Sequence, residues 1–391
     1  MLKVAFGQSK MLSKPISGVL HLIVYIGFII INIELLEIIL DGLLGTHRLF
    51  APYLGSFYNF LIGSFEILAA FVIFSVIFFW TRRNLIKIKR FWSPEMSGWP
   101  KRDADIILYF EIILMSLFLS MNSTDLLLQN LESPNYLKAG SFPISQFLTP
   151  LFNSFTQDTL IIFERTFWWL HITGILIFLN YLYYSKHLHI LLAFPNTFFA
   201  NLDPKGKFNN NKMVYREVKQ MLEPNSDPYL TNDNNADQSK FGVSDVLDLN
   251  WIQLMNSYSC TECGRCTAEC PANQTGKLLS PRKIMMDTRD RLEEVGRNIS
   301  LNGSFKDDGN ELLDNYITKE EIWACTSCNA CVEACPIGID PLSIIMEMRQ
   351  YLVLEQSSAP SDLNNMMNNI ENNGAPWPFN NQDRLLWAED N

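Results

Sequence analysis

Every one of the eight cysteines in this 391-residue chain lies in one of two short runs. The runs are Cys260-Thr-Glu-Cys263-Gly-Arg-Cys266-Thr-Ala-Glu-Cys270-Pro271 and Cys325-Thr-Ser-Cys328-Asn-Ala-Cys331-Val-Glu-Ala-Cys335-Pro336. Each run has two residues between its first three cysteines, three residues before the fourth, and a proline directly after it. A spacing that returns unchanged predicts two related loops with one shared chemistry.

This spacing is typical of the bacterial two-cluster ferredoxins. In that pattern three closely spaced thiolates hold one four-iron cluster, and the fourth cysteine of the run ligates the other cluster. The sequence therefore predicts two 4Fe-4S clusters. One would be held by Cys260, Cys263, Cys266 and Cys335, and the other by Cys325, Cys328, Cys331 and Cys270.

Zinc and disulfides are the ordinary alternatives for so many cysteines. Zinc sites are usually built from separated pairs of ligands that close a tetrahedron, which leaves the third and fourth cysteines of each run unexplained. Four disulfides would be typical of a small secreted domain rather than of a chain of this length. The iron-sulfur interpretation accounts for all eight residues.

Charge divides the chain into two unlike halves. Residues 1–200 carry 14 Lys and Arg against 12 Asp and Glu, a net of +2, whereas the remaining residues carry 17 against 29, a net of −12. The cysteine runs lie in the acidic half. An acidic, Asn-rich surface argues against nucleic acid as a partner.

Four apolar runs in the first half are long enough to cross a ~30 Å hydrocarbon core. They cover about Ser17–Leu44, Phe57–Trp80, Asp105–Leu128 and Thr159–Leu192. No small-residue cleavage site precedes the first run, so it is expected to be a retained anchor.

Basic residues set the expected orientation of these helices. The loop between the second and third runs contains Arg82, Arg83, Lys87, Lys89, Arg90, Lys101 and Arg102, whereas the opposite loops contain Arg48 and Lys138. By the positive-inside rule the basic loop, both termini and the cluster domain face the cytoplasm. The sequence thus predicts a multi-pass protein of the inner (cytoplasmic) membrane, with its thiolates in a reducing compartment.

The expected fold class is all-α, a four-helix transmembrane domain followed by a mostly helical two-cluster ferredoxin domain. The domains are predicted at residues 1–200 for the transmembrane part, 201–243 for a polar linker that includes Thr231–Asp237, 244–357 for the ferredoxin part, and 358–391 for an Asn-rich docking tail. Helices in the ferredoxin part are expected at Leu279–Val295, Asn310–Ile322 and Pro341–Leu354. Trp377 and Trp387 favour a docking function for the tail, and packing against its own domain is the alternative.

Residues 251–352 resemble the iron-sulfur subunit of heterodisulfide reductase and its relatives in respiratory complexes. The motifs that carry the likeness are Tyr258-Ser-Cys-Thr-Glu-Cys-Gly-Arg-Cys, Leu279-Ser-Pro-Arg-Lys-Ile, Trp323-Ala-Cys-Thr-Ser-Cys and Cys335-Pro-Ile-Gly-Ile-Asp. By topology and histidine placement, the membrane half is similar to the cytochrome b subunits of the nitrate reductase gamma and heterodisulfide reductase type. The adjacent cysteine pair of that family's disulfide-reducing centre is absent from this sequence, so the resemblance implies that a partner subunit converts the substrate.

The histidines of the membrane half are the candidate haem ligands. On a regular fourth helix His171 and His189 would share a face about 27 Å apart, and His187 would point about 160° away from His171. We expect His21 and His189 to pair at one b-type haem near the cytoplasmic side, and His47 and His171 to pair at the other. The alternative is that His21, His47 and His187 or His189 are interfacial polar residues, and that His171 makes an interhelical hydrogen bond.

Acidic residues also lie within the predicted membrane helices, at Glu34, Glu37, Glu66, Glu111 and Glu164. Glu34, Glu37 and Asp41 fall on one helical face. Proton delivery to a quinone is one interpretation, and structural pairing, for instance of Glu164 with Arg165, is the other.

These features together predict an electron-transfer subunit of a quinone-linked, membrane-bound oxidoreductase. Electrons would pass between two 4Fe-4S clusters and membrane quinone, through one or two b-type haems. The expected partners are the lipid bilayer, quinone, and a cytoplasmic cysteine-rich or flavin-containing redox subunit that carries the substrate site. The alternatives are a haem-free anchor that feeds a quinone site and a redox-sensing membrane protein.

Overall fold

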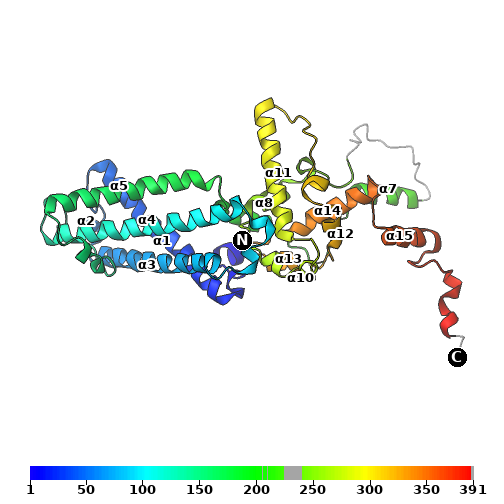
Figure 1. Ribbon diagram of the computed structural model, residues 1–391, viewed down its shortest axis with the longest axis horizontal. Coiled ribbons are helices and arrows are strands. Elements are labelled where there is room, and N and C mark those ends of the chain that lie inside the picture. Colours follow the sequence, from blue (N-terminus) through cyan, green and yellow to red (C-terminus); the bar gives the residue numbers. More distant parts are fainter. Residues whose placement is uncertain (205, 209, 224–239, 389–391) are drawn as a thin grey trace. The chain divides into compact units, whose positions relative to one another are not determined.

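The computed structural model describes residues 1–204, 206–208, 210–223 and 240–388 (Figure 1). The chain divides into two compact units. The first contains Met1–Phe198 and Tyr258–Gly264, and the second contains Phe199–Ser257 and Arg265–Asn391. The described residues form helices and no strand, with one isolated bridge between Leu313 and Ile317, so the all-α prediction is confirmed. Residues 224–239 of the expected linker, including Thr231–Asp237, lie outside the described residues.

Four helices of the first unit are long and apolar enough to cross a membrane. They are α1 (Pro15–Leu44), α3 (Ser56–Asn84), α4 (Trp99–Asn130) and α5 (Gln157–Leu182). Even α5, with 26 residues, reaches about 39 Å at 1.5 Å per residue, which exceeds the hydrocarbon thickness. Within this unit α4 packs against α5, α1 against α3, and α3 against α4 (Figure 1).

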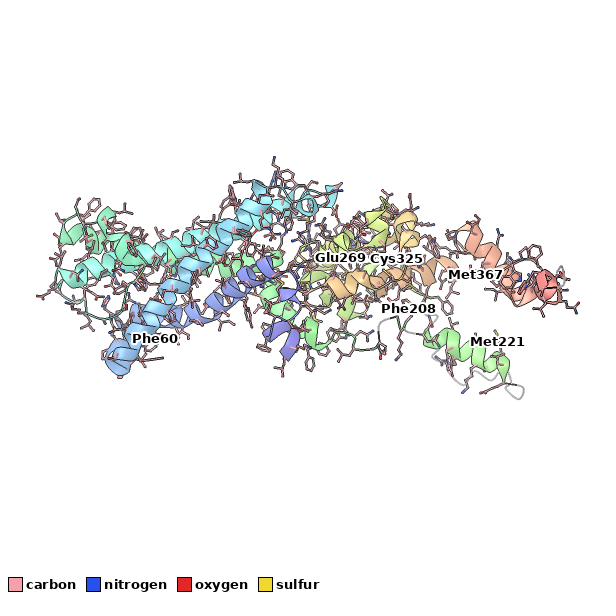
Figure 2. The ribbon with its side chains drawn as sticks, turned by 90° about the horizontal axis from the view of Figure 1, so that it is seen from below. Phe60, Phe208, Met221, Glu269, Cys325 and Met367 are labelled. Carbon is pink, nitrogen blue, oxygen red and sulfur yellow. The ribbon has the colours of Figure 1, made fainter. Side chains whose placement is uncertain are left out.

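Large apolar side chains point both inward and outward from this bundle. Phe65 and Phe118 are completely buried in the shared core, whereas Phe60 and Ile162 are 70% and 63% exposed. Figure 2 shows Phe60 directed away from α3. Such an outer surface is stable against lipid tails, which are as apolar as the side chains themselves.

The chain breaks its helix after Leu182, which corrects the prediction of one helix over Thr159–Leu192. Ser185 is extended, Lys186–Leu188 forms a single 3-10 turn, and α6 (His189–Phe198) begins a new helix. The Ser185 hydroxyl accepts a hydrogen bond from the His187 amide at 3.1 Å, and Asp103 Oδ2 accepts one from the Lys186 amide at 3.1 Å. The five-turn register between His171 and His189 therefore does not exist.

The second unit is built from shorter helices around one long one. Its helices are α7 (Lys212–Leu222), α8 (Trp251–Ser259), α9 (Arg265–Ala268), α10 (Pro271–Gln274), α11 (Pro281–Asn302), α12 (Lys319–Ala324), α13 (Ala330–Ala334), α14 (Pro341–Leu354) and α15 (Ser361–Asn373). Two residues of α8, Tyr258 and Ser259, are grouped with the first unit. A further short helix, α2 (Ala51–Leu54), belongs to the first unit.

The remaining helical elements are short. The 3-10 turns are Met11–Ser13, Lys89–Phe91, Pro94–Met96, Ser145–Phe147, Thr149–Leu151, Lys186–Leu188, Val246–Asp248 and Asn381–Ala388, and the π turns are Leu2–Phe6 and Leu312–Tyr316. The turn at Leu312–Tyr316 contains a left-handed residue, Asp314, with φ of +72°. The helix expected over Asn310–Ile322 is thus wrong, and only α12 is regular there.

Helix α11 forms the centre of the second unit. Ser280 caps its start and Pro281 occupies its first turn, where a missing amide hydrogen costs nothing. Ile284, Thr288 and Val295 are buried along one face with helical spacing. Helix α11 packs against α14, which follows the second cysteine run, and against α9, which lies within the first run.

Candidate iron-sulfur ligands and membrane histidines

The two cysteine loops share an unusual backbone conformation. In the first loop Glu262 and Gly264 have φ of +57° and +70°, and at the equivalent positions of the second loop Ser327 and Asn329 have φ of +56° and +60°. Residues with side chains pay a steric penalty in this left-handed region, and such strain concentrates at functional sites. The repeated sequence therefore folds into a repeated loop.

The cysteines of the second predicted ligand set lie on neighbouring elements of the second unit. Cys325 ends α12, Cys331 lies in α13, and Cys270 follows α9, which packs against α13. Burial raises the pKa of the Cys331 thiol to about 12, and the neighbouring Cys325 and Cys270 add to the rise. Burial also raises the pKa of Cys325, with Cys270 and Cys328 acting in the same direction. Bound iron would oppose these shifts by favouring the thiolates.

Backbone amides point at two of the candidate sulfurs. The Ser327 amide donates to Cys325 Sγ at 3.4 Å, and the Ile339 amide donates to Cys335 Sγ at 3.3 Å. Hydrogen bonds to cluster sulfurs are one of the means by which a protein sets a cluster's reduction potential. In the described parts of the chain, no three His, Cys, Asp or Glu side chains are grouped tightly enough to hold a single metal ion.

The first predicted set divides between the two units. Cys260 and Cys263 lie in Tyr258–Gly264 of the first unit, whereas Cys266 and Cys335 lie in the second. Their joint ligation of one cluster stays a prediction.

Arg349 of α14 holds the second loop and was not anticipated from the sequence. Its guanidinium donates to the carbonyls of Ile322 (2.8 Å) and Cys325 and to the Ser327 hydroxyl (3.3 Å). It also lies 5.0 Å from the centre of the Trp323 ring. The positive charge works against the rise in the Cys325 pKa. The one signal available in the sequence was a basic residue on the helix that follows the cysteine run.

His187 and His189 lie together at the start of α6, with ring centres 5.3 Å apart. His189 Nδ1 donates to the Lys186 carbonyl at 3.1 Å. Burial, together with nearby His189 and His21, lowers the pKa of His187 to about 3. The structure thus groups His21, His187 and His189, and the helix break removes the regular register from which His187 was expected to point about 160° away from His171.

His171 is buried between α5 and α4. Its Nδ1 donates to the Leu114 carbonyl at 3.0 Å, and its ring lies 5.9 Å from that of Phe118. A Cβ atom at Gly174 would lie 2.8 Å from Leu114 Cδ2, so this glycine permits close packing of α5 against α4.

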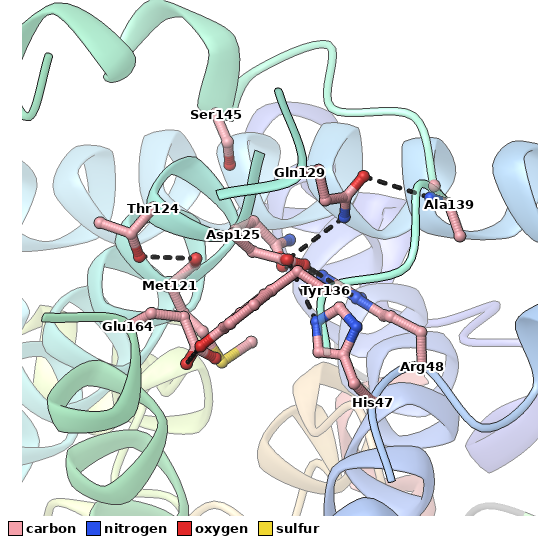
Figure 3. A network of polar contacts seen from close by, with 12 residues as sticks. His47, Arg48, Met121, Thr124, Asp125, Gln129, Tyr136, Ala139, Ser145 and Glu164 are labelled. Atoms are coloured by element: carbon pink, nitrogen blue, oxygen red, sulfur yellow. Dashed lines mark hydrogen bonds and ion pairs between the residues drawn. The ribbon is translucent and has the colours of Figure 1, made fainter. Parts of the chain in front are cut away.

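His47 belongs to a buried polar network (Figure 3). Its Nδ1 accepts from the Leu137 amide at 3.3 Å, so its Nε2 donates to Asp125, 3.1 Å away. Arg48 donates to Asp125 at 2.8 Å and to Glu34 at 3.2 Å. Both ring nitrogens of His47 therefore have protein partners, and this arrangement does not fit an axial haem ligand.

Three of the acidic residues within the membrane helices, Glu37, Glu66 and Glu164, have polar partners in loops or on their own helix. Glu37 accepts from the Phe50 amide and the Tyr58 hydroxyl, both at 2.8 Å, and Glu66 accepts from the Ile144 and Ser145 amides at 2.9 and 3.1 Å. Tyr136 and Arg165 donate to Glu164 in the same way. These contacts support the structural interpretation of the acids rather than proton delivery.

Comparisons with known proteins agree with the class that the fold and loops define, an iron-sulfur protein with membrane-length helices. Residues 259–339 match a family model described as a 4Fe-4S dicluster domain. The chain is 28% identical to "Probable iron-sulfur-binding oxidoreductase FadF" of Bacillus subtilis (strain 168), over 98% of this chain and 54% of the relative. It is 26% identical to the EtfAB:quinone oxidoreductase of Syntrophomonas wolfei, over 99% of this chain and 53% of the relative.

More distant relatives share the cluster region. One belongs to the dihydromethanophenazine:CoB--CoM heterodisulfide reductase of Methanosarcina acetivorans and is 28% identical over 37% of this chain and 36% of the relative. The homologues are thus iron-sulfur electron-transfer oxidoreductases, several of them components of complexes. The chain spans about half the length of the first two relatives. No solved structure is significantly similar to it.

Proposed function

We propose that the chain carries electrons between a water-soluble redox partner and membrane quinone, through two 4Fe-4S clusters. The observation that carries this proposal is that Cys270, of the first run, lies near Cys325 and Cys331 of the second, since a fourth cysteine that ligates the other run's cluster is typical of two-cluster ferredoxins. The four membrane-length helices supply the path to a lipid-soluble acceptor. A relative named as an EtfAB:quinone oxidoreductase supports quinone as that acceptor.

The cysteines proposed as ligands are Cys260, Cys263, Cys266 and Cys335 for the first cluster and Cys325, Cys328, Cys331 and Cys270 for the second. Each cluster carries one electron at a time. Reduction of a quinone consumes two electrons and two protons, so two transfers complete one turnover.

We propose one b-type haem at the end of the first unit where His21, His187 and His189 lie. His189 donates its Nδ1 hydrogen to a backbone carbonyl, which is the usual orientation of a metal-ligating histidine and leaves Nε2 for the iron. Burial lowers the pKa of His189, so its imidazole is neutral at neutral pH. We propose His189 and His21 as the ligands of one haem, which would pass single electrons onward. His171 has a similarly bonded Nδ1, but the contacts of His47 leave it without the expected partner, so the proposal includes one haem.

The membrane half is proposed to be similar to cytochrome b subunits of the nitrate reductase gamma type. We further propose an inner-membrane location with the basic loop and clusters on the cytoplasmic side. A relative described as a probable membrane-anchored ferredoxin supports membrane attachment of a cluster domain. The soluble partner would be a flavin-containing or cysteine-rich redox subunit.

The test is the anaerobically purified protein in detergent. About eight iron and eight sulfide per chain are expected for two cubane clusters, whereas stoichiometric zinc would overturn the proposal. A pyridine haemochrome assay should find haem in the wild type, no haem in His189→Ala, and nearly wild-type haem in the matched variant His187→Ala. A wild type without haem that still reduces a menaquinone analogue would favour the haem-free anchor. A protein whose clusters stay reduced when quinone is added would favour the redox sensor.

A further inference from the structure

Lys186 connects several parts of the first unit through one buried side chain. It lies in the turn after α5 and is 8% exposed. Its amino group donates to the Glu262 carboxylate and to the Pro100 carbonyl at 2.6 Å, and it lies 3.9 Å from Asp103 Oδ2. Asp103 is in turn bound by the Tyr181 hydroxyl at 2.5 Å. Removing one member of such a buried ion pair is costly, because it leaves the other charge buried without a partner. The contact of Lys186 with the two carboxylates is therefore expected to be maintained.

The partner Glu262 belongs to the first cysteine loop. It lies directly before Cys263, its side chain is 2% exposed, and its backbone has φ of +57°. A residue held in this conformation is kept there by surrounding contacts. The Lys186 contact is therefore one that fixes the peptide next to a candidate cluster ligand.

The same lysine also orients a histidine. Its carbonyl accepts the hydrogen bond from His189 Nδ1 at 3.1 Å. The side chain of Lys186 thus contacts the cysteine loop while its backbone contacts the proposed haem ligand, within the first unit.

The second loop has a different partner at the equivalent position. Ser327, which occupies the position of Glu262 in the repeat, is held by Arg349 of its own unit at 3.3 Å. The two loops share one backbone conformation, and the equivalent positions have different partners, Lys186 for Glu262 and Arg349 for Ser327. The two loops have the same cysteine spacing in the sequence, and this difference in partners distinguishes the two proposed clusters.

We propose that Lys186 is a positioning residue that holds the first cysteine loop on the membrane unit. The cluster of Cys260, Cys263 and Cys266 is then the one that exchanges electrons with the membrane acceptor, and the second cluster exchanges electrons with the soluble partner. Each step moves one electron from a reduced to an oxidised centre, and the quinone takes up its protons from water. The proposed electron order rests on the proposed function, whereas the anchoring of the loop by Lys186 does not depend on it.

The anchoring is tested with Lys186→Met in the complete protein. Hydrogen exchange of residues 258–264 should become faster than in the wild type, whereas residues 325–331 should exchange at the wild-type rate. Lys186→Arg, which keeps the charge, should restore much of the protection. The control is Lys207→Met, because Lys207 pairs with Asp203 in an exposed ion pair with side chains 60% and 41% exposed. Wild-type exchange of residues 258–264 in Lys186→Met would overturn the anchoring.

The electron order is tested on the same variants. Electron paramagnetic resonance should show a changed signal for the first cluster, identified as the one altered in Cys263→Ser, and an unchanged second cluster. Oxidation of the reduced clusters by a menaquinone analogue should slow about tenfold or more, because small misplacements of reacting centres lower reaction rates strongly. Glu262→Gln keeps the shape of the side chain and should also change the signal of the first cluster. It provides a second test in case Lys186→Met does not fold.

Two results separate the proposals. If the wild-type clusters are not oxidised by quinone, the proposed function fails, and the exchange measurement still decides the anchoring. If Lys186→Met and Glu262→Gln both leave the first cluster's signal and its oxidation rate at wild-type values, the electron order is overturned while the proposed function survives.

Discussion

Asn329 and Gly264 occupy the same left-handed position in their two loops, with φ of +60° and +70°. Glycine adopts this conformation without a steric penalty, asparagine tolerates it, and β-branched residues do not. The conformation turns the backbone between the second and third cysteines of each run. Residue identity at this position therefore controls whether the loop closes.

Asn329→Gly should keep both clusters, because the first loop already has glycine there. Asn329→Val should destabilise the second loop by about 1–2 kcal/mol or more and lower the iron content toward half. Iron and sulfide analysis of both variants measures this. Full iron in the valine variant would mean that the loop does not need its left-handed residue.

Arg48 is the central cation of the polar network in the membrane unit, and it is 6% exposed. Its removal leaves Asp125 and Glu34 buried without their main counter-charge. Arg48→Met should therefore lower the stability of this unit by about 3–5 kcal/mol. Thermal unfolding in detergent measures the loss. Arg82→Met is the control. The Arg82 guanidinium lies 5.9 Å from the Phe78 ring, so its removal should lower stability far less than the removal of Arg48.

At the scale of elements, the sequence predicted those features that depend on the local pattern of residues. The four apolar runs, the helices that follow each cysteine run, and the spacing of the thiols come from short-range periodicity. The break after Leu182 does not, because it is stabilised by Asp103, a residue 83 positions away from Lys186. The loop-binding function of Glu37 and Glu66 was equally hidden, since their partners are backbone amides of distant loops.

Helix α11 is fixed by one arginine. Arg291 is fully buried and donates to Asp245 at 2.9 and 3.0 Å and to Asp308 at 2.7 and 2.9 Å. Lysine cannot reproduce two forked contacts, so Arg291→Lys should destabilise the second unit by about 2–4 kcal/mol and shorten the lifetime of both clusters.

The control for that change lies on the same helix. Arg297 pairs with Glu293 at 3.3 Å with its side chain 72% exposed, so Arg297→Lys should change stability by less than about 1 kcal/mol. The decay of the cluster absorption in urea compares the two variants. Equal decay rates would contradict the importance of the forked contacts.

At the scale of the whole molecule, the proposed electron transfer needs two exchange partners, one in the lipid and one in water. The lipid side is provided by the exposed apolar faces of the four long helices. For the water side, the end of the chain has an unusual surface. No residue of α15 is buried, and Leu363, Met366, Met367 and Ile370 recur at the spacing of one helical face. Figure 2 labels Met367 on this helix.

The residues after α15 extend this apolar surface, with Trp377, Phe379 and Trp387 exposed by 43%, 66% and 74%. A helix with anchors at this spacing followed by exposed aromatic residues is suited to docking in a groove of another protein. Deletion of residues 358–391 should therefore leave about eight iron per chain in place and weaken retention of the redox partner by tenfold or more, about 1.4 kcal/mol. Co-purification at fixed salt and detergent measures it. Leu301→Asp serves as the control, because Leu301 is an exposed apolar residue on α11 outside the tail, at 85%. A truncated protein that keeps its partner as firmly as the full chain would show that the partner binds elsewhere on the second unit.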